Sequence, residues 1–186
     1  MKTESEFMNE VMEKLNRATT DIHCLVTDKE ELEGKAKDKK YYSAQYISET
    51  LYPAIKEKRS TIQQKQEQIL RDIGGMIEQQ KQDYLALDAV KAEELNDSVI
   101  RLITMDLLTE EELEKLFDEF AGNPTMQKII LKMSEKAGKH IQRYFTGHRE
   151  QIAGLNSLLD VVRIFVNNWI DKPESHEMIK KLFNIQ

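Results

Sequence analysis

The apolar residues of the N-terminal segment recur at heptad spacing, with Lys29 as the one break. The stripe consists of Met8, Val11, Leu15, Ala18, Ile22, Leu25 and Leu32. Such spacing places one narrow seam along a helix, which is typical of a coiled coil or an antiparallel helical hairpin. Because one seam requires one partner helix, we expect five of these residues to mediate self-association: Met8, Val11, Leu15, Ile22 and Leu25.

A second helical pattern follows that is long but thinly apolar. Ser43 is a suitable N-cap for a short helix towards Leu51, and Pro53 places the start of a longer helix near Tyr52, running to about Leu87. Its apolar residues are Ile55, Ile62, Ile69, Ile73, Met76, Tyr84 and Leu87. A helix this polar is expected to be mostly exposed, because unpaired polar groups are costly to bury. We therefore expect residues 1–87 to form an elongated antiparallel helical arm.

Two local features of this arm carry predictions of their own. The pair Gly74-Gly75 predicts a bend or hinge, with a close helix crossing as the alternative. Tyr41, Tyr42 and Tyr46 indicate a connection that is packed against the arm.

Beyond residue 87 the apolar residues become dense and the helix boundaries are clearly marked. Thr109 and Glu112 have the spacing of a capping box, Gly122 is a suitable left-handed stop, and Asn123-Pro124 restarts a helix. The segment from Leu155 to Ile170 reads as a core helix that Pro173 ends, and a last amphipathic helix carries Met178, Ile179, Leu182, Phe183 and Ile185. We therefore expect a compact bundle of short helices over residues 88–186, and an all-α protein overall.

Composition and charge restrict the class of protein. The chain has only 3 Pro and 7 Gly, which favours helices, and its net charge of −6 argues against a surface coated for nucleic acid. No apolar stretch approaches the roughly 20 residues of a membrane span, and acidic residues occupy the N-terminal segment where a signal peptide is apolar. We expect a soluble, cytoplasmic protein without a membrane partner. Cys24, the only cysteine, has apolar neighbours that predict a buried, reduced thiol.

The charges are unevenly distributed. Acids dominate from Asp88 to Glu119, and a basic stretch follows whose members we call the basic face: Lys128, Lys132, Lys136, Lys139, Arg143 and Arg149. With Tyr144 and Phe145 among them, these residues are candidates for contacting nucleic acid or an acidic protein. A solvated helix surface is the more ordinary interpretation of the same run.

Patterns that carry catalytic or metal chemistry are missing from the sequence. There is no Cys-x-x-Cys, His-Glu-x-x-His, Gly-x-Ser-x-Gly or nucleotide-binding fingerprint. His140 and His148 lie about 80° out of register on a helix, and the carboxylates of residues 110–119 are explained by the helix dipole. We therefore expect no enzyme, no metal and no cofactor.

Residues 41–138 resemble small helical proteins encoded beside capsid and scaffold genes in tailed phages and prophages of Gram-positive bacteria. The matching motifs are a Tyr-Ser/Thr-x-x-Tyr start, a long polar helix and a capped Leu-Thr helix ending in Gly-Asn-x-Thr-Met. They correspond here to Tyr42, Ser43, Tyr46, Leu108, Thr109, Gly122, Asn123, Thr125 and Met126. The resemblance implies a virion or assembly protein with no catalytic residues.

Two functional hypotheses follow. The first is a phage or prophage structural or assembly protein, located in the bacterial host cell or incorporated into a virion, that self-associates through its arm and contacts other virion proteins. The second is a regulatory helical module whose basic face contacts nucleic acid or an acidic protein.

Overall fold

The computed structural model describes residues 2–183, and within them every regular element is helical. The expectation of an all-α protein is confirmed. By their packing the residues form two compact units: unit 1 comprises Met1–Gln80 and Leu155–Gln186, and unit 2 comprises Lys81–Gly154.

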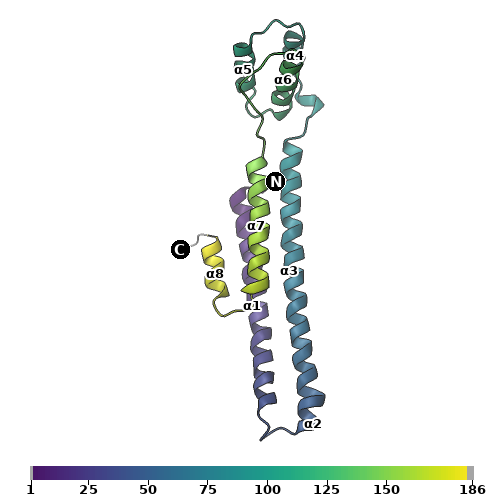
Figure 1. The fold of residues 1–186 in the computed structure, drawn as a ribbon, viewed down its shortest axis with the longest axis vertical. Coiled ribbons are helices and arrows are strands. Elements are labelled where there is room, and N and C mark those ends of the chain that lie inside the picture. The colour runs from purple at the N-terminus through teal and green to yellow at the C-terminus, as the bar shows by residue number, and fades with distance from the viewer. Residues whose placement is uncertain (1, 184–186) are drawn as a thin grey trace. The chain divides into compact units, whose positions relative to one another are not determined.

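Unit 1 is built on an antiparallel hairpin of two long helices, α1 (Glu4–Lys37) and α3 (Tyr52–Leu87), of which residues up to Gln80 belong to this unit (Figure 1). A short helix α2 (Ala44–Tyr46) and a π-helical turn η1 (Ile47–Leu51) connect them. Ion pairs from Lys58 to Asp28 and from Lys65 to Asp21 join the two helices. The expected helical hairpin is thus present.

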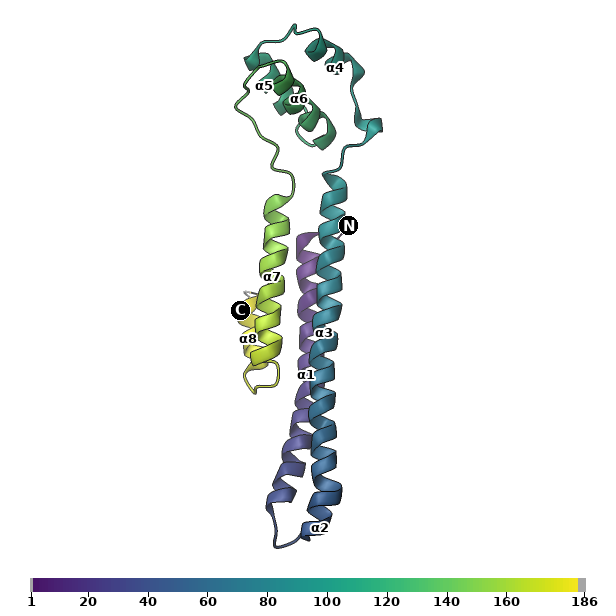
Figure 2. The same cartoon turned by 45° about the vertical axis from the view of Figure 1, so that its right-hand side comes forward.

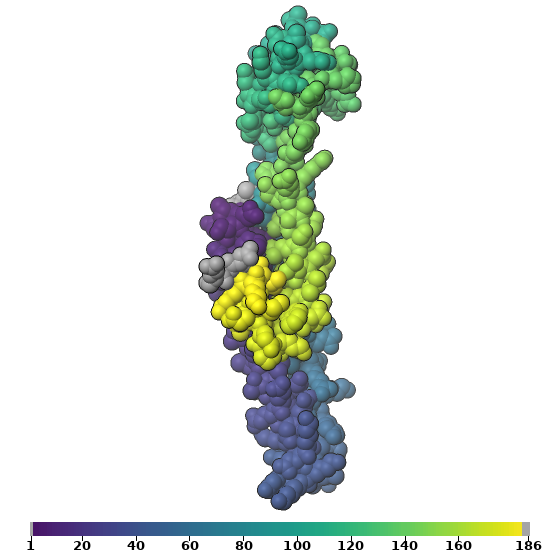
Figure 3. All heavy atoms as spheres, turned by 60° about the vertical axis from the view of Figure 1, so that its left-hand side comes forward, coloured from purple at the N-terminus to yellow at the C-terminus, as the bar shows by residue number. Residues whose placement is uncertain are grey.

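The last third of unit 1 comes from the C-terminal part of the chain. In Figure 2 the helix α7 (Arg149–Asn168), of which the residues from Leu155 onwards belong to this unit, runs alongside α1 and α3. Helix α8 (Ser175–Leu182) folds back along α7. Figure 3 shows α8 lying between α1 and α7 on that face. The Gln66 side-chain amide donates to the carbonyl of Val166 at 3.3 Å, and His23 Nε2 lies 2.8 Å from the carbonyl of Lys172.

This division differs from the expected arm of residues 1–87 and bundle of residues 88–186. The buried helix expected from Leu155 onwards is confirmed, since α7 buries four apolar side chains: Leu155, Val162, Phe165 and Val166. These side chains lie in unit 1 and not in the unit of short helices. The thin apolar faces of α1 and α3 explain the difference, because a third helix supplies the apolar surface that two polar helices lack.

Unit 2 contains a 3₁₀ turn η2 (Ala92–Glu94) and the helices α4 (Asp97–Thr104), α5 (Glu110–Glu119) and α6 (Pro124–Lys136). The end of α3 and the start of α7, up to Gly154, also belong to it. Helix α6 packs against both α4 and α5. Their shared core consists of Ile103, Leu113, Phe117 and Ile130.

The helix boundaries expected from capping residues are confirmed. The Thr109 hydroxyl accepts from the Glu112 amide at 3.3 Å, while the Glu112 carboxylate accepts from the Thr109 amide at 2.8 Å. Asn123 caps α6 by accepting from the Met126 amide, and Gly122 has a φ of +92°. A second capping box, Thr3 with Glu6, begins α1.

Two local expectations are wrong, and a third is correct only in part. Helix α3 runs unbroken through Gly74-Gly75, and a Cβ at either glycine would meet no heavy atom within 4 Å, so no close crossing requires them. Cys24 is exposed, because two residues along a helix rotate it by about 200° from buried Ile22. The expectation that Tyr41, Tyr42 and Tyr46 pack against the arm holds for Tyr42, which contacts a buried cluster, whereas Tyr41 and Tyr46 are exposed. The expected apolar position Ile185 lies outside the described residues.

Candidate interaction surfaces

The residues expected to mediate self-association lie mostly inside unit 1. Val11, Leu15 and Ile22 are fully buried, while Met8 and Leu25 are partly buried. Helix α8 packs against α1, ion pairs join α3 to it, and α7 runs alongside, so the chain's own helices cover this stripe. A second copy of the protein could not reach the three buried residues without displacing these helices. Self-association through this stripe stays a prediction, and the periodicity that motivated it has an intramolecular explanation.

The buried face of α1 also contains a polar group that the stripe did not predict. Thr19 is fully buried, and its hydroxyl has no hydrogen-bond partner among the described residues. A buried hydroxyl without a partner loses the free energy of its hydration, on the order of 1–3 kcal/mol. Thr19 therefore weakens the core of unit 1.

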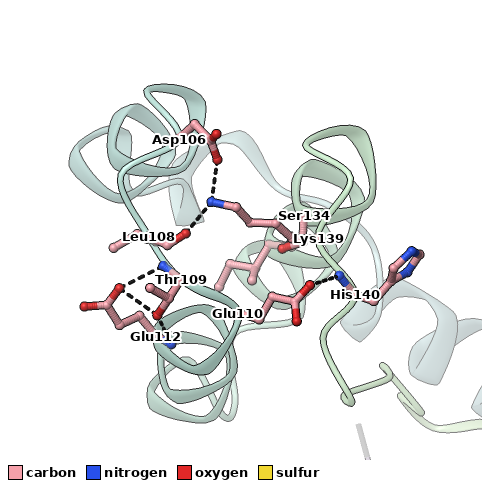
Figure 4. Close-up of polar contacts among 9 residues, drawn as sticks. Asp106, Leu108, Thr109, Glu110, Glu112, Ser134, Lys139 and His140 are labelled. Carbon is pink, nitrogen blue, oxygen red and sulfur yellow. Dashed lines mark hydrogen bonds and ion pairs between the residues drawn. The ribbon is translucent and has the colours of Figure 1, made fainter.

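On the basic face, Lys139 connects the end of α6 to the loop that precedes α5. Helix α6 ends in a Schellman motif in which Gly138 has a φ of +71° and the Lys139 amide donates to Ser134 O at 2.9 Å. The Lys139 ammonium then reaches the loop after α4, where it donates to Leu108 O and pairs with the Asp106 carboxylate (Figure 4). Beside it the His140 amide donates to Glu110 Oε1 at 2.7 Å. These contacts fasten the start of α5 to the end of α6.

Arg143 is also engaged within unit 2. Its guanidinium makes two hydrogen bonds to Asp118, at 2.9 and 3.0 Å, and pairs with Glu114 at 3.2 Å. The bond from Arg143 lowers the pKa of Asp118 and the bond to Asp118 raises the pKa of Arg143. Since an ion pair of this fork geometry satisfies both partners, Arg143 and the acids of α5 hold unit 2 together rather than forming a free charged surface.

The remaining basic residues differ in whether their side chains already have an interaction partner. Lys128 donates to Asp88 O and lies 4.6 Å from the centre of the Phe145 ring. Lys132, Lys136 and Arg149 are exposed, and their side chains have no ion pair among the residues that the structure describes. A groove of about 450 Å³ runs beside Lys132 and is lined by Leu131 and Ile141 as well as by basic side chains. Only half of the expected basic face is therefore available to a partner.

His148 and His23 each contact polar groups within their own unit. His148 Nδ1 lies 2.8 Å from Asp88 Oδ1, and its ring stacks on Tyr84 with 4.9 Å between centroids. His23 lies 3.0 Å from Ser175 Oγ, so it links α1 to the start of α8. Within residues 2–183 no group of three or more His, Cys, Asp or Glu side chains has an arrangement that could hold a metal ion.

The α4 patch, which we define as Leu102, Met105 and Leu107, is an apolar surface that the sequence did not reveal. The exposed fractions of these side chains are 43, 66 and 60%. They are held together by a second Schellman motif, in which the Leu107 amide donates to Leu102 O at 3.4 Å and the Asp106 amide to Ile103 O at 3.0 Å.

The backbone of this motif is strained. Asp106 has a φ of +56°, a conformation that costs a residue with a side chain about 1 kcal/mol or more. In this motif the residues corresponding to Leu102 and Leu107 commonly make an apolar contact. Here both also face solvent, and the ion pair of Asp106 with Lys139 fixes the loop in this form. The α4 patch is therefore a preorganised apolar surface.

Among the described residues, no helix has both the length and the apolar character needed to cross a bilayer. Comparisons of the chain with protein-family models, with curated proteins and with solved structures gave no match.

Proposed function

We propose that this chain is a non-catalytic assembly protein that binds other protein chains and copies of itself, and that it contributes to the structure or assembly of a phage or prophage particle. The observation that carries the binding role is the exposed α4 patch. The link to phage particles rests on the resemblance of residues 41–138, with their Tyr-Ser-x-x-Tyr start and Gly-Asn-x-Thr-Met end, to the phage proteins described above.

The size of the α4 patch determines what kind of contact it supports. Complete burial of a large apolar side chain stabilises a complex by roughly 1.5–3 kcal/mol, so three half-exposed ones contribute about 3 kcal/mol. A micromolar complex requires about 8 kcal/mol. The α4 patch is therefore the centre of a larger contact, to which exposed Val90 and Leu95 of the same unit are available to contribute. Repeated weak contacts of this kind suit a protein that assembles at high local concentration.

Self-association is assigned to the α4 patch because the α1 stripe is already covered by the chain itself. The test compares a triple variant of the α4 patch with a double variant of exposed apolar residues on α7. Leu102→Ser, Met105→Ser and Leu107→Ser together remove the α4 patch, whereas Val161→Ser with Ile164→Ser remove exposed apolar side chains from α7. Size-exclusion chromatography with light scattering then gives the mass of each protein over a range of concentrations.

We expect the unmodified chain and the α7 variant to form oligomers and the α4 variant to remain monomeric. Oligomers of equal mass in all three proteins would overturn the role of the α4 patch. The phage role is tested separately, by mass spectrometry of particles purified after prophage induction in the source bacterium. Absence of the chain from both mature particles and assembly intermediates would overturn it.

A regulatory module remains the alternative function, and the free charges of Lys132 and Lys136 beside the α6 groove are the observation that favours it. A gel shift with duplex DNA that weakens as salt is added would support this alternative, because phosphate contacts release counterions. If Lys132→Gln with Lys136→Gln left such a shift unchanged, the basic face would not be its cause.

A further inference from the structure

The turn that joins α1 to α3 presents tyrosines to solvent. The exposed fractions are 75% for Tyr41, 44% for Tyr46 and 57% for Tyr52. Exposure of three large aromatic side chains within so short a segment is unusual, because aromatic rings normally contribute to a core. We call the surface formed by residues 35–59 the hairpin tip.

A small core beneath the hairpin tip fixes this arrangement. Ala36, Ile47, Leu51 and Ile55 are buried together, and half-buried Tyr42 packs on them. Tyr42 also stacks on Tyr46, with ring centroids 5.7 Å apart and an angle of 18° between the planes. The π-helical turn η1 places Ile47 and Leu51 on the buried side and leaves the residues between them exposed. Such turns are rare in proteins, and those that occur are often found at functional sites. The backbone conformation of this turn therefore holds the aromatic side chains in exposed positions.

A groove lies beside Tyr52, between the end of α1 and the start of α3. Its volume is about 520 Å³, and its polar lining is mainly basic: Lys37, Lys56 and Arg59, with Tyr52 contributing a ring. Glu33 is the one acid of the lining, and it is already bound by Arg59 at 2.6 Å. That bond lowers the pKa of Glu33, so the acid stays ionised and paired.

Further positive charge surrounds the groove. Lys39 and Lys40 are exposed at the turn, and the Lys40 ammonium lies 5.7 Å from the centre of the Tyr41 ring. Lys37 and Lys56 form no ion pair with a carboxylate among the residues described. Within the hairpin tip, four cations form no ion pair among the described residues, against three acids, Asp38, Glu49 and Glu57. Around the groove itself, Lys37 and Lys56 are the free charges.

From these contacts we infer that the hairpin tip binds single-stranded nucleic acid, with bases stacked on Tyr41 and Tyr52 and phosphates held by Lys37 and Lys56. Exposed aromatic rings alternating with cations are the surface that unpaired bases and a phosphate backbone require. An acidic protein is less suited to this surface, because lysine is depleted from protein–protein interfaces while it is the common contact to phosphate. The inference does not depend on the proposed assembly function.

The test uses the full chain and a fluorescently labelled oligothymidylate of about 20 nucleotides. Fluorescence anisotropy measures its affinity at low salt and over a salt titration. Tyr41→Ser with Tyr52→Ser removes the stacking surface, and Lys37→Gln with Lys56→Gln removes two cations. Lys115→Gln with Lys181→Gln is the matched control, because it removes the same charge from two exposed lysines outside the hairpin tip. Circular dichroism establishes that each variant is folded.

We expect the tyrosine variant to bind at least about fivefold more weakly, since each stacked base contributes that much or more. The lysine variant should lower the slope of log K against log salt by about 0.7 per lysine, while the control keeps both affinity and slope. No binding by the folded, unmodified chain at low salt would overturn the inference. So would equal loss in the control, equal affinity for a duplex of the same sequence, or equal affinity for a labelled oligoglutamate. An oligouridylate bound as tightly as oligothymidylate agrees with the inference, which rests on bases and phosphates alone.

Discussion

Substitution of Phe165 tests most directly whether α7 is packed in the core of unit 1. Its side chain is 2% exposed within unit 1, while the neighbouring Ile164 is 59% exposed. Truncation of a buried Phe to Ala costs about 3–5 kcal/mol, because the apolar transfer free energy is lost and a cavity remains. With a urea m-value of about 2 kcal/mol/M, the unfolding midpoint should fall by roughly 2 M. Ile164→Ala should change the free energy of unfolding by less than about 0.5 kcal/mol.

The single Trp169, which lies at the end of α7, makes the measurement specific to unit 1. Its fluorescence is followed during urea unfolding of the unmodified chain, Phe165→Ala and Ile164→Ala. If Phe165→Ala does not fold, Phe165→Leu provides a milder change of about 1 kcal/mol with the same sign. Equal midpoints for Phe165→Ala and Ile164→Ala would refute the placement of α7 in a buried position of unit 1.

Three further substitutions test local features. Gly147→Ala should destabilise unit 2 by more than about 1 kcal/mol, because Gly147 has a φ of +53° and a Cβ there would lie 2.3 Å from Asp88 Oδ2; thermal unfolding followed by circular dichroism measures this. Thr19→Val should raise the stability of unit 1 by about 1 kcal/mol in the Trp fluorescence assay, since it removes a buried hydroxyl without a partner, and a loss of stability would contradict this. The Thr109 amide and hydroxyl lower the pKa of Glu112 below its usual 4.5, so the stabilisation by ionised Glu112 is present above pH 4.5 and is lost as pH falls through the lowered pKa. The protection factors of α5 amides, which correct for the intrinsic slowing of exchange in acid, should therefore fall below pH 4.5, and Glu112→Gln should reduce this pH dependence.

Features that depend on neighbouring residues were predictable from the sequence. The capping box of Thr109 with Glu112, the cap of Asn123 and the left-handed Gly122 were all placed correctly, because each depends on side chains within one turn of the backbone it satisfies. The capping box of Thr3 with Glu6 carries the same signal in the sequence. Exposure of Cys24 was also readable, since its position relative to Ile22 follows from helix geometry alone.

Features that depend on distant parts of the chain were not predictable in the same way. The pattern from Leu155 onwards identifies a buried helix, but it contains no information on which unit that helix completes. Likewise, the heptad stripe through Val11 and Leu15 specifies a partner helix without distinguishing the chain's own helices from a second copy. Leu102 and Leu107 belong to a dense apolar run, and only the tertiary fold separates them from buried Ile103.

The proposed function requires that the chain associates with copies of itself. Sedimentation equilibrium of the unmodified full chain over about a hundredfold range of concentration tests it most directly, because association shifts mass by mass action. We expect the weight-average mass to rise with concentration above the 21.7 kDa of one chain. A mass of 21.7 kDa at every concentration would contradict the claim.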